Sequence, residues 1–194
     1  DLMAPLLEGI MKVAKLVENR RFELFDQPMP PFGPDQVLIK VRYCGVCATE
    51  IHFWLQAHDR NKIYGHEVVG DVVAVGSSVS HIKLGMRVTG MIYDGFAEYT
   101  VADAARLVAI PDAVDDLSAF GEPLSCLISA VDRMPIQLGD HVAIVGAGYM
   151  GLGLLKFIKI KGAGKITVID IRDESLDLAR RFGADEVFHP DQVP

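Results

Sequence analysis

The chain has 194 residues, half of them apolar, so it can bury one complete hydrophobic core and part of a second. Its formal net charge is −7 and no basic run stands out, which argues against binding to nucleic acid or to an anionic membrane. No apolar stretch approaches the roughly 20 residues that a membrane-spanning helix needs. Three cysteines argue against a disulfide scaffold and for a reducing compartment, with the cytoplasm as the default location.

The first two-thirds of the chain has the pattern of strands and turns. Residues 1–10 lack the basic start and cleavage site of a secretory signal, and we expect them to be an N-terminal extension. Alternating or short apolar runs predict strands at residues 37–43, 68–75, 87–92, 97–101 and 107–110. Their close spacing favours a compact, mostly antiparallel β domain over residues 11–131.

The pattern changes near Glu122, where the remaining elements alternate between helix and strand. A helix is expected at 123–133, then a strand at 142–145, a helix after residue 148, a strand at 165–170, a helix at 174–182 and a strand at 186–188. This order predicts the first half of a doubly wound parallel sheet over residues 132–194. Because a parallel sheet that ends on its first strand leaves an unprotected edge, we expect the domain to be truncated here or its remaining segments to be missing.

Three separated residues offer the donors of a catalytic zinc site. Cys47 can supply a thiolate, His66 an imidazole nitrogen and Glu122 a carboxylate oxygen, which leaves one of four tetrahedral positions open. Thr49 can take a proton from a bound alcohol and His52 can pass it to solvent. Glu50 is placed to accept a hydrogen bond from a ligand imidazole.

The cysteines also allow two other interpretations. Cys44 and Cys47 form a CxxC pair, which is also typical of a redox site or half of a zinc knuckle. No second CxxC exists, and we expect no helix after Cys47 of the kind that follows a thioredoxin-like pair, so both are disfavoured. Cys126, one helical turn after Glu122, could replace that glutamate, although a buried free cysteine is the commoner role.

The motif GAGYMG follows an apolar strand and precedes a helix, as a dinucleotide-binding loop requires. Gly146 allows the tight turn, Gly148 the approach of a pyrophosphate and Gly151 the close packing of helix on strand. Asp170 would accept the ribose hydroxyls and repel a 2′-phosphate, so NAD is favoured over NADP. Arg172 could contact a phosphate, but a solvated arginine is favoured.

Together, YCGVCATEIH (43–52), GHEVVGDVVAVG (65–76), GEPLSC (121–126) and GAGYMG (146–151) resemble the zinc-dependent medium-chain dehydrogenases, the superfamily of alcohol, sorbitol and threonine dehydrogenases. The resemblance implies a GroES-like catalytic domain followed by a Rossmann domain. Glutamate in the EPLS stretch is nearer to the polyol dehydrogenases than to alcohol dehydrogenases with cysteine there. No cysteine occurs between residues 86 and 99, so a structural zinc lobe is not expected.

The resemblance also implies roles for individual residues. Cys47 and His66 would bind zinc, with Glu122 or Glu67 completing the set directly or through water, and Thr49 and His52 would form the proton relay. Phe53 and Trp54 would line the substrate pocket. The implied NAD-binding residues are Gly146, Gly148, Tyr149, Met150, Gly151, Asp170 and Arg172.

The function expected from these residues is the transfer of hydride between a secondary alcohol or polyol and NAD. The resemblance to the superfamily implies assembly into a dimer or tetramer. A zinc-free quinone or enoyl reductase of the same superfamily is one alternative. A catalytically inactive zinc-binding remnant is the other.

Overall fold

The computed structural model describes residues 9–56 and 59–193. The chain divides into two compact units, Asp1–Glu122 and Pro123–Pro194. Residues 1–8 of the expected N-terminal extension lie outside the described residues, and strand β1 already begins at Ile10. The domain bounds expected at 10/11 and 131/132 stay predictions. None of the helices in the described ranges is long and apolar enough to cross a membrane.

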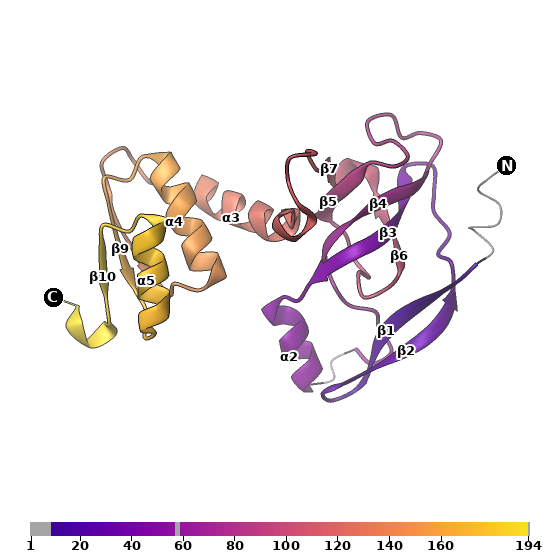
Figure 1. Cartoon of the computed structure of the whole chain (residues 1–194), viewed down its shortest axis with the longest axis horizontal. Coiled ribbons are helices and arrows are strands. Elements are labelled where there is room, and N and C mark those ends of the chain that lie inside the picture. The colour runs from indigo at the N-terminus through magenta and orange to yellow at the C-terminus, as the bar shows by residue number, and fades with distance from the viewer. Residues whose placement is uncertain (1–8, 57–58, 194) are drawn as a thin grey trace. The chain divides into compact units, whose positions relative to one another are not determined.

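An antiparallel sheet of five strands, in the order β6-β3-β4-β5-β7, forms the centre of the first unit (Figure 1). Its strands are β3 (Gln36–Gly45), β4 (Glu67–Val75), β5 (Arg87–Met91), β6 (Tyr99–Asp103) and β7 (Leu107–Ala109). All five expected strands are therefore confirmed, with β6 beginning two residues later than the sequence predicted. Short 3-10 helices follow at Ala104–Arg106 and Asp116–Ser118.

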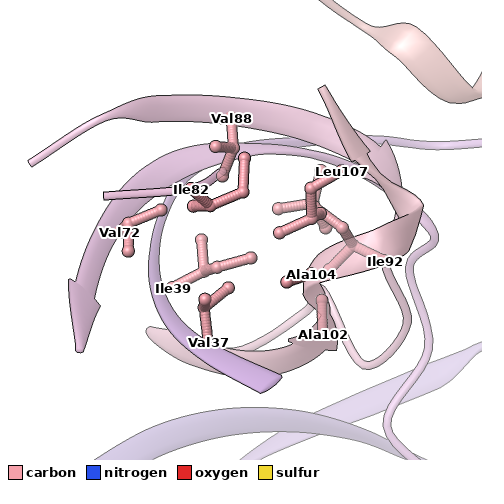
Figure 2. Close-up of a cluster of buried hydrophobic side chains, with 10 residues drawn as sticks. Val37, Ile39, Val72, Ile82, Val88, Ile92, Ala102, Ala104 and Leu107 are labelled. Atoms are coloured by element: carbon pink, nitrogen blue, oxygen red, sulfur yellow. The ribbon is translucent and has the colours of Figure 1, made fainter. Parts of the chain in front are cut away.

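The sheet curves around a core of aliphatic side chains that alternate along its strands. Val37, Ile39, Val68, Val88 and Ile92 are fully buried there. Figure 2 shows side chains from this cluster converging on the inside of the curve. Because the core is closed by the curvature of one sheet, the end of β3 and the start of β4 are held at fixed positions. Cys47 follows the end of β3 by two residues, and Glu67 is the first residue of β4.

Two features of this unit were not predicted from the sequence. The hairpin of β1 (Ile10–Glu18) and β2 (Arg21–Pro28) forms a separate sheet, with Met11, Val13 and Leu16 buried and most of β2 exposed. Helix α2 (Ala48–Gln56) begins directly after Cys47, so the expectation of no helix there was wrong. Its sequence, ATEIHFWLQ, contains β-branched and aromatic residues that favour strands on their own, and the helix is set by its cap and its packing.

Asp116 joins two arginines on the outside of this sheet. Its Oδ2 lies 2.8 Å from Arg42 Nη1 and its Oδ1 lies 2.6 Å from Arg87 Nη1. The two guanidinium groups hold the pKa of Asp116 below its ordinary value. Arg87 also donates to the carbonyls of Pro111 and Val114, so this carboxylate fixes the segment that leads from β7 toward the next helix.

A pH prediction follows from the lowered pKa of Asp116. Its contribution to stability is present above the unfolded pKa, near 3.8, and is lost as the pH falls through the still lower folded pKa. We expect Asp116→Asn to have a lower urea midpoint than wild type at pH 7. The difference between the two midpoints should disappear below pH 3.8. Asp112→Asn is the control, and an equal loss for Asp116→Asn at both pH values would contradict the prediction.

The second unit has the predicted alternation of helices and strands. Its parallel sheet has the order β10-β9-β8, from β8 (His141–Val145), β9 (Lys165–Ile169) and β10 (Glu186–Phe188). Helices α4 (Tyr149–Lys161) and α5 (Asp173–Phe182) connect the strands, and Gly162 and Gly183 end them in left-handed conformations. A 3-10 helix follows at Pro190–Gln192. Among the described residues, β8 pairs on one side only.

Helix α3 (Gly121–Arg133) begins two residues before the predicted start at Pro123. Glu122 therefore lies in its first turn. Leu155, Ile158, Ile166, Val168 and Ala179 form the centre of the core of the second unit. The partial doubly wound sheet expected from the sequence is confirmed.

Candidate metal centre and nucleotide loop

Cys47 is positioned by the start of α2. Its carbonyl accepts hydrogen bonds from the N–H groups of Glu50, at 3.1 Å, and Ile51, at 3.3 Å. The carboxylate of Glu50 reaches back and accepts the N–H of Cys47 through Oε2 at 3.0 Å. This is the glutamate half of a capping box, which fixes the entry of the chain into a helix. The backbone at Cys47 is thereby held, and with it the direction of the thiol.

The same carboxylate contacts the ring of His66. Glu50 Oε1 lies 2.6 Å from His66 Nδ1, and Glu50 is only 4% exposed. Because a carboxylate is an acceptor, it favours the tautomer with a proton on Nδ1, which leaves Nε2 as the free donor atom. The hydrogen bond expected for Glu50 is therefore present, and one buried side chain orients both Cys47 and His66.

Three potential ligand atoms converge near this glutamate. One donor atom each from Cys47, His66 and Glu67 lies within 4.8 Å of the others. Glu67 starts β4 directly opposite Gly45 of β3. A Cβ on Gly45 would lie 2.2 Å from Glu67 Oε2, so the missing side chain makes room for this carboxyl group. Burial, followed by the charge of Glu122, raises the pKa of Glu67.

Glu122 lies near the same group but is not part of it among the described residues. The N–H of Gly121 donates to the hydroxyl of Thr89 at 2.9 Å, and that hydroxyl donates to the carbonyl of Val68 at 2.9 Å. These bonds fix the first turn of α3 against β4 and β5. Glu122 is 8% exposed and lines a cavity together with His66. The choice between Glu67 and Glu122 as third ligand stays a prediction.

A helix directly after Cys47 is typical of a CxxC redox pair, but the environment of Cys44 argues against that function. Burial raises the pKa of the Cys44 thiol to about 12. Its Sγ donates to the carbonyl of Gly45 at 3.4 Å, and neither Cys44 nor Cys47 is in a disulfide. Because the thiolate is the reactive form, Cys44 is a poor partner for disulfide exchange. Cys126 is exposed on α3, which differs from the buried position expected for it.

A cavity of about 580 Å³ in the first unit opens beside His66. Thr49 lines it, with Oγ1 3.6 Å from Cys47 Sγ. Phe53 also lines it, and its ring centroid lies 5.4 Å from that of Tyr64. Of the residues described, His52 and Trp54 do not line this cavity, and His52 is exposed on α2.

Several wall residues were not identified from the sequence. The remaining residues that line the cavity are Glu50, Lys62, Ile63, Tyr64, Gly65, Met91, Tyr93 and Asp94. No motif surrounds Lys62 or Asp94, so only the fold reveals that they share one wall with His66.

The glycine loop of the second unit has the geometry of a phosphate site. Gly146 has φ +100°, and Gly148 is the N-cap of α4 without any side-chain cap. The first N–H groups of α4 are therefore not occupied by a capping side chain, which suits an anion. A Cβ on Gly151 would lie 1.8 Å from the carbonyl oxygen of Gly146, so helix and loop touch through bare backbone. Tyr149 and Met150 are exposed at the start of α4.

Asp170, directly after β9, closes the other side of a cavity of about 300 Å³ that includes Gly146. Its Oδ2 accepts the N–H of Ala147 at 2.6 Å, and its Oδ1 accepts the N–H of Arg172 at 2.9 Å. These hydrogen bonds lower the pKa of Asp170, and the bond from Ala147 makes the largest contribution. The side chain of Arg172 is 61% exposed and its Nε lies 3.3 Å from Asp170 Oδ1. The carboxylate is thus ionised and fixed beside the glycine loop.

Comparison with known proteins agrees with this arrangement. Residues 33–112 match the model of the alcohol dehydrogenase GroES-like domain. A protein from Sinorhizobium meliloti 1021, assigned as a zinc-binding dehydrogenase and crystallised with NADP, aligns over 95% of this chain with a TM-score of 0.84 and 28% identity. The chain belongs to the zinc-dependent medium-chain dehydrogenase superfamily.

Members of this superfamily with assigned substrates are also similar to the chain. L-threonine 3-dehydrogenase of Francisella philomiragia is 32% identical over 82% of this chain and 55% of its own length. Sorbitol dehydrogenase of Bacillus subtilis is 29% identical over 92% of this chain and 61% of its own length. Galactitol-1-phosphate dehydrogenase of Escherichia coli has a TM-score of 0.80 at 25% identity, over 95% of this chain and 62% of its own. The chain thus spans little more than half the length of these relatives.

Proposed function

We propose that this chain forms the zinc-binding part of a dehydrogenase that transfers hydride between a secondary alcohol or polyol and NAD. The observation that carries the proposal is the convergence of donor atoms from Cys47, His66 and Glu67 within 4.8 Å, beside a cavity large enough for a small alcohol. Similarity to sorbitol dehydrogenase and to D-arabinitol dehydrogenase 1 of Uromyces fabae supports the substrate class.

The donor set fits zinc. Thiolate sulfur, imidazole nitrogen and carboxylate oxygen are its usual ligands, and three protein ligands leave one position for a substrate. Cys47 and His66 are the constant ligands in this proposal, with Glu67 or Glu122 as the third. Bound here, zinc would lower the pKa of an alcohol hydroxyl.

The residues around the donors would orient the substrate and accept its proton. Thr49, whose hydroxyl lies at the cavity wall close to Cys47, would take the proton, and the exposed His52 would pass it to solvent. Glu50 would hold His66 in the tautomer that leaves Nε2 free. The apolar side chains of Phe53, Ile63 and Met91 would keep water from the carbon chain of the substrate.

The nucleotide loop would bind NAD. A fixed, ionised Asp170 can accept ribose hydroxyls and repels a 2′-phosphate, which favours NAD over NADP. Assembly into a dimer or tetramer and a cytoplasmic location complete the proposal.

Cobalt provides the direct test because a cysteine thiolate bound to Co²⁺ gives a near-ultraviolet absorption band. We expect one equivalent of Co²⁺ to produce this band, zinc to displace it, and Cys47→Ser to abolish the band and lower the zinc affinity more than about 100-fold, a loss of more than 2.7 kcal/mol. Cys126→Ser, which removes the exposed thiol on α3, is the matched control and keeps the band. A Cys47→Ser chain that retains the band would overturn the proposal.

Two alternatives predict other outcomes. NADH formation from alcohols without bound metal would indicate a zinc-free reductase of the same superfamily. Stoichiometric metal without any turnover in the longest available form of the protein would indicate an inactive zinc-binding remnant.

A further inference from the structure

The loop between β5 and β6 is short and firmly held. The hydroxyl of Thr100 donates to the carbonyl of Tyr93 at 2.7 Å, and the N–H of Gly95 donates to the carbonyl of Gly65 at 2.9 Å. A Cβ on Gly95 would lie 2.7 Å from Cys44 Sγ, so the turn sits tightly on β3. Asp94, between the two anchored residues, has φ +55° and lines the cavity beside His66. The turn thus fixes the backbone of Asp94 at the cavity wall.

The carboxylate of Asp94 has no protein partner in the described part of the chain. No hydrogen bond or ion pair involves it within residues 9–56 and 59–193, although the side chain reaches solvent through the cavity. Asp94 is exposed, but the protein around it removes part of its hydration, which raises the pKa of Asp94, and Lys62 offsets part of this rise. Lys62 itself lies 4.0 Å from Asp59 and over the ring of Tyr64. A partly desolvated carboxylate without a donor is stabilised by any ligand that brings one.

The charges around the cavity indicate which ligands can bring a hydrogen-bond donor to Asp94. Glu50, Asp94 and Glu122 line it, against Lys62 as the only lysine or arginine among the described wall residues. Glu50 is already bonded to Cys47 and His66. This excess of acidic groups disfavours a substrate with a carboxylate or phosphate and favours one with hydroxyl or ammonium donors.

We propose that Asp94 determines specificity by accepting a hydrogen bond from a second donor group of the substrate, a hydroxyl or an ammonium on a carbon near the reacting alcohol. The inference rests on the proposed function, which assigns this cavity to the substrate. A site that pairs with a polar group of its ligand favours that ligand over an analogue without the group, because the analogue forms one hydrogen bond fewer. The cavity therefore discriminates between polar alcohols and simple ones.

Ligand binding to the existing chain tests this inference without turnover. The Kd values of 2-butanol, 2,3-butanediol and 3-amino-2-butanol are measured by NMR titration, with and without zinc. We expect the two difunctional ligands to bind about tenfold more tightly than 2-butanol, as one hydrogen bond to a charged group provides. Asp94→Gly should remove this advantage, and Asp94→Asn should remove it for the amine while keeping part of it for the diol.

Both variants suit the backbone at this position, because glycine and asparagine tolerate a positive φ, and thermal unfolding checks that they fold. Asp177→Asn, on the exposed surface of α5, is the matched control and keeps the wild-type ranking. The inference fails if Asp94→Gly still binds the two difunctional ligands more tightly than 2-butanol, or if wild type binds all three ligands equally. It also fails if 3-hydroxybutyrate binds most tightly to wild type and Lys62→Gln abolishes this tighter binding. The ligand affinities are also measured without zinc, so this test does not depend on the metal assignment. An error in the metal assignment would be detected by the cobalt titration instead.

Discussion

Glu50→Ala is expected to weaken zinc binding by roughly 10- to 100-fold, although Glu50 is not a ligand in the proposed site. Its carboxylate accepts the N–H of Cys47 at 3.0 Å and contacts His66 Nδ1 at 2.6 Å. Alanine removes both hydrogen bonds, so the imidazole of His66 can rotate and the backbone at the start of α2 loses its capping bond. The metal-free chain should also lose about 1–3 kcal/mol of stability, because two partly buried polar groups lose their partner. Competition with a chelator measures the first effect and urea unfolding the second.

A comparison of two further variants shows whether the effect comes from orientation. Glu50→Gln has one acceptor oxygen for two donors, so its zinc affinity should fall between wild type and Glu50→Ala. Glu23→Ala, on the exposed strand β2, should leave zinc affinity unchanged. If Glu50→Ala binds zinc like wild type, the carboxylate does not position the donors.

Gly151→Ala is expected to lower the stability of the second unit by about 1–3 kcal/mol, which is the usual cost of forcing an extra carbon into a packed site. The new Cβ would lie 1.8 Å from the carbonyl oxygen of Gly146 and 2.9 Å from its carbonyl carbon. These are backbone atoms, and the N–H of Gly146 is also bonded to the carbonyl of Ile169 at 2.8 Å, so the loop cannot move without disturbing the sheet. Hydrogen exchange of the amides in β8 and α4 should accelerate, and urea unfolding should begin at lower concentration.

Gly148→Ala is the matched control within the same loop. Its φ is −74°, and the nearest atom to a new Cβ is the Arg172 guanidinium at 4.0 Å. Stability should therefore change little. Because the pyrophosphate is proposed to approach the backbone here, NADH affinity should still fall. Equal stability of the two variants would show that the contact at Gly151 is not a packing constraint.

Much of the fold was predictable because its signals are local. Alternation in residues 37–43 and 68–75 identified β3 and β4, and glycine after residue 182 identified the end of α5. The β1–β2 hairpin was missed because β2 is exposed along most of its length and shows no alternation. Helix α2 was missed because its β-branched and aromatic residues favour strands on their own, while its start is held by Glu50, which bonds to Cys47 and to the distant His66.

The candidate site was predictable in its residue types and only partly in its geometry. Cys47, His66 and the two glutamates were named from their motifs, and the hydrogen bond from Glu50 was anticipated. Residue spacing cannot decide which glutamate approaches the thiol, because that depends on how Gly45 admits the Glu67 carboxyl group and where α3 begins. Lys62 and Asp94 carry no motif, and the turn that places Asp94 at the cavity is held by contacts with distant residues.

The sequence by itself determined the chemistry available to this protein: a soft-donor metal set, a glycine-rich phosphate loop and an acidic residue after the second strand of that unit. These signals can be recognised from the sequence alone because each depends on residue type and short spacing. Only the tertiary structure decided which donors meet, which thiol is buried and which charges face the cavity. Those outcomes depend on burial and on contacts between segments far apart in the chain, and neither is encoded within a single local pattern.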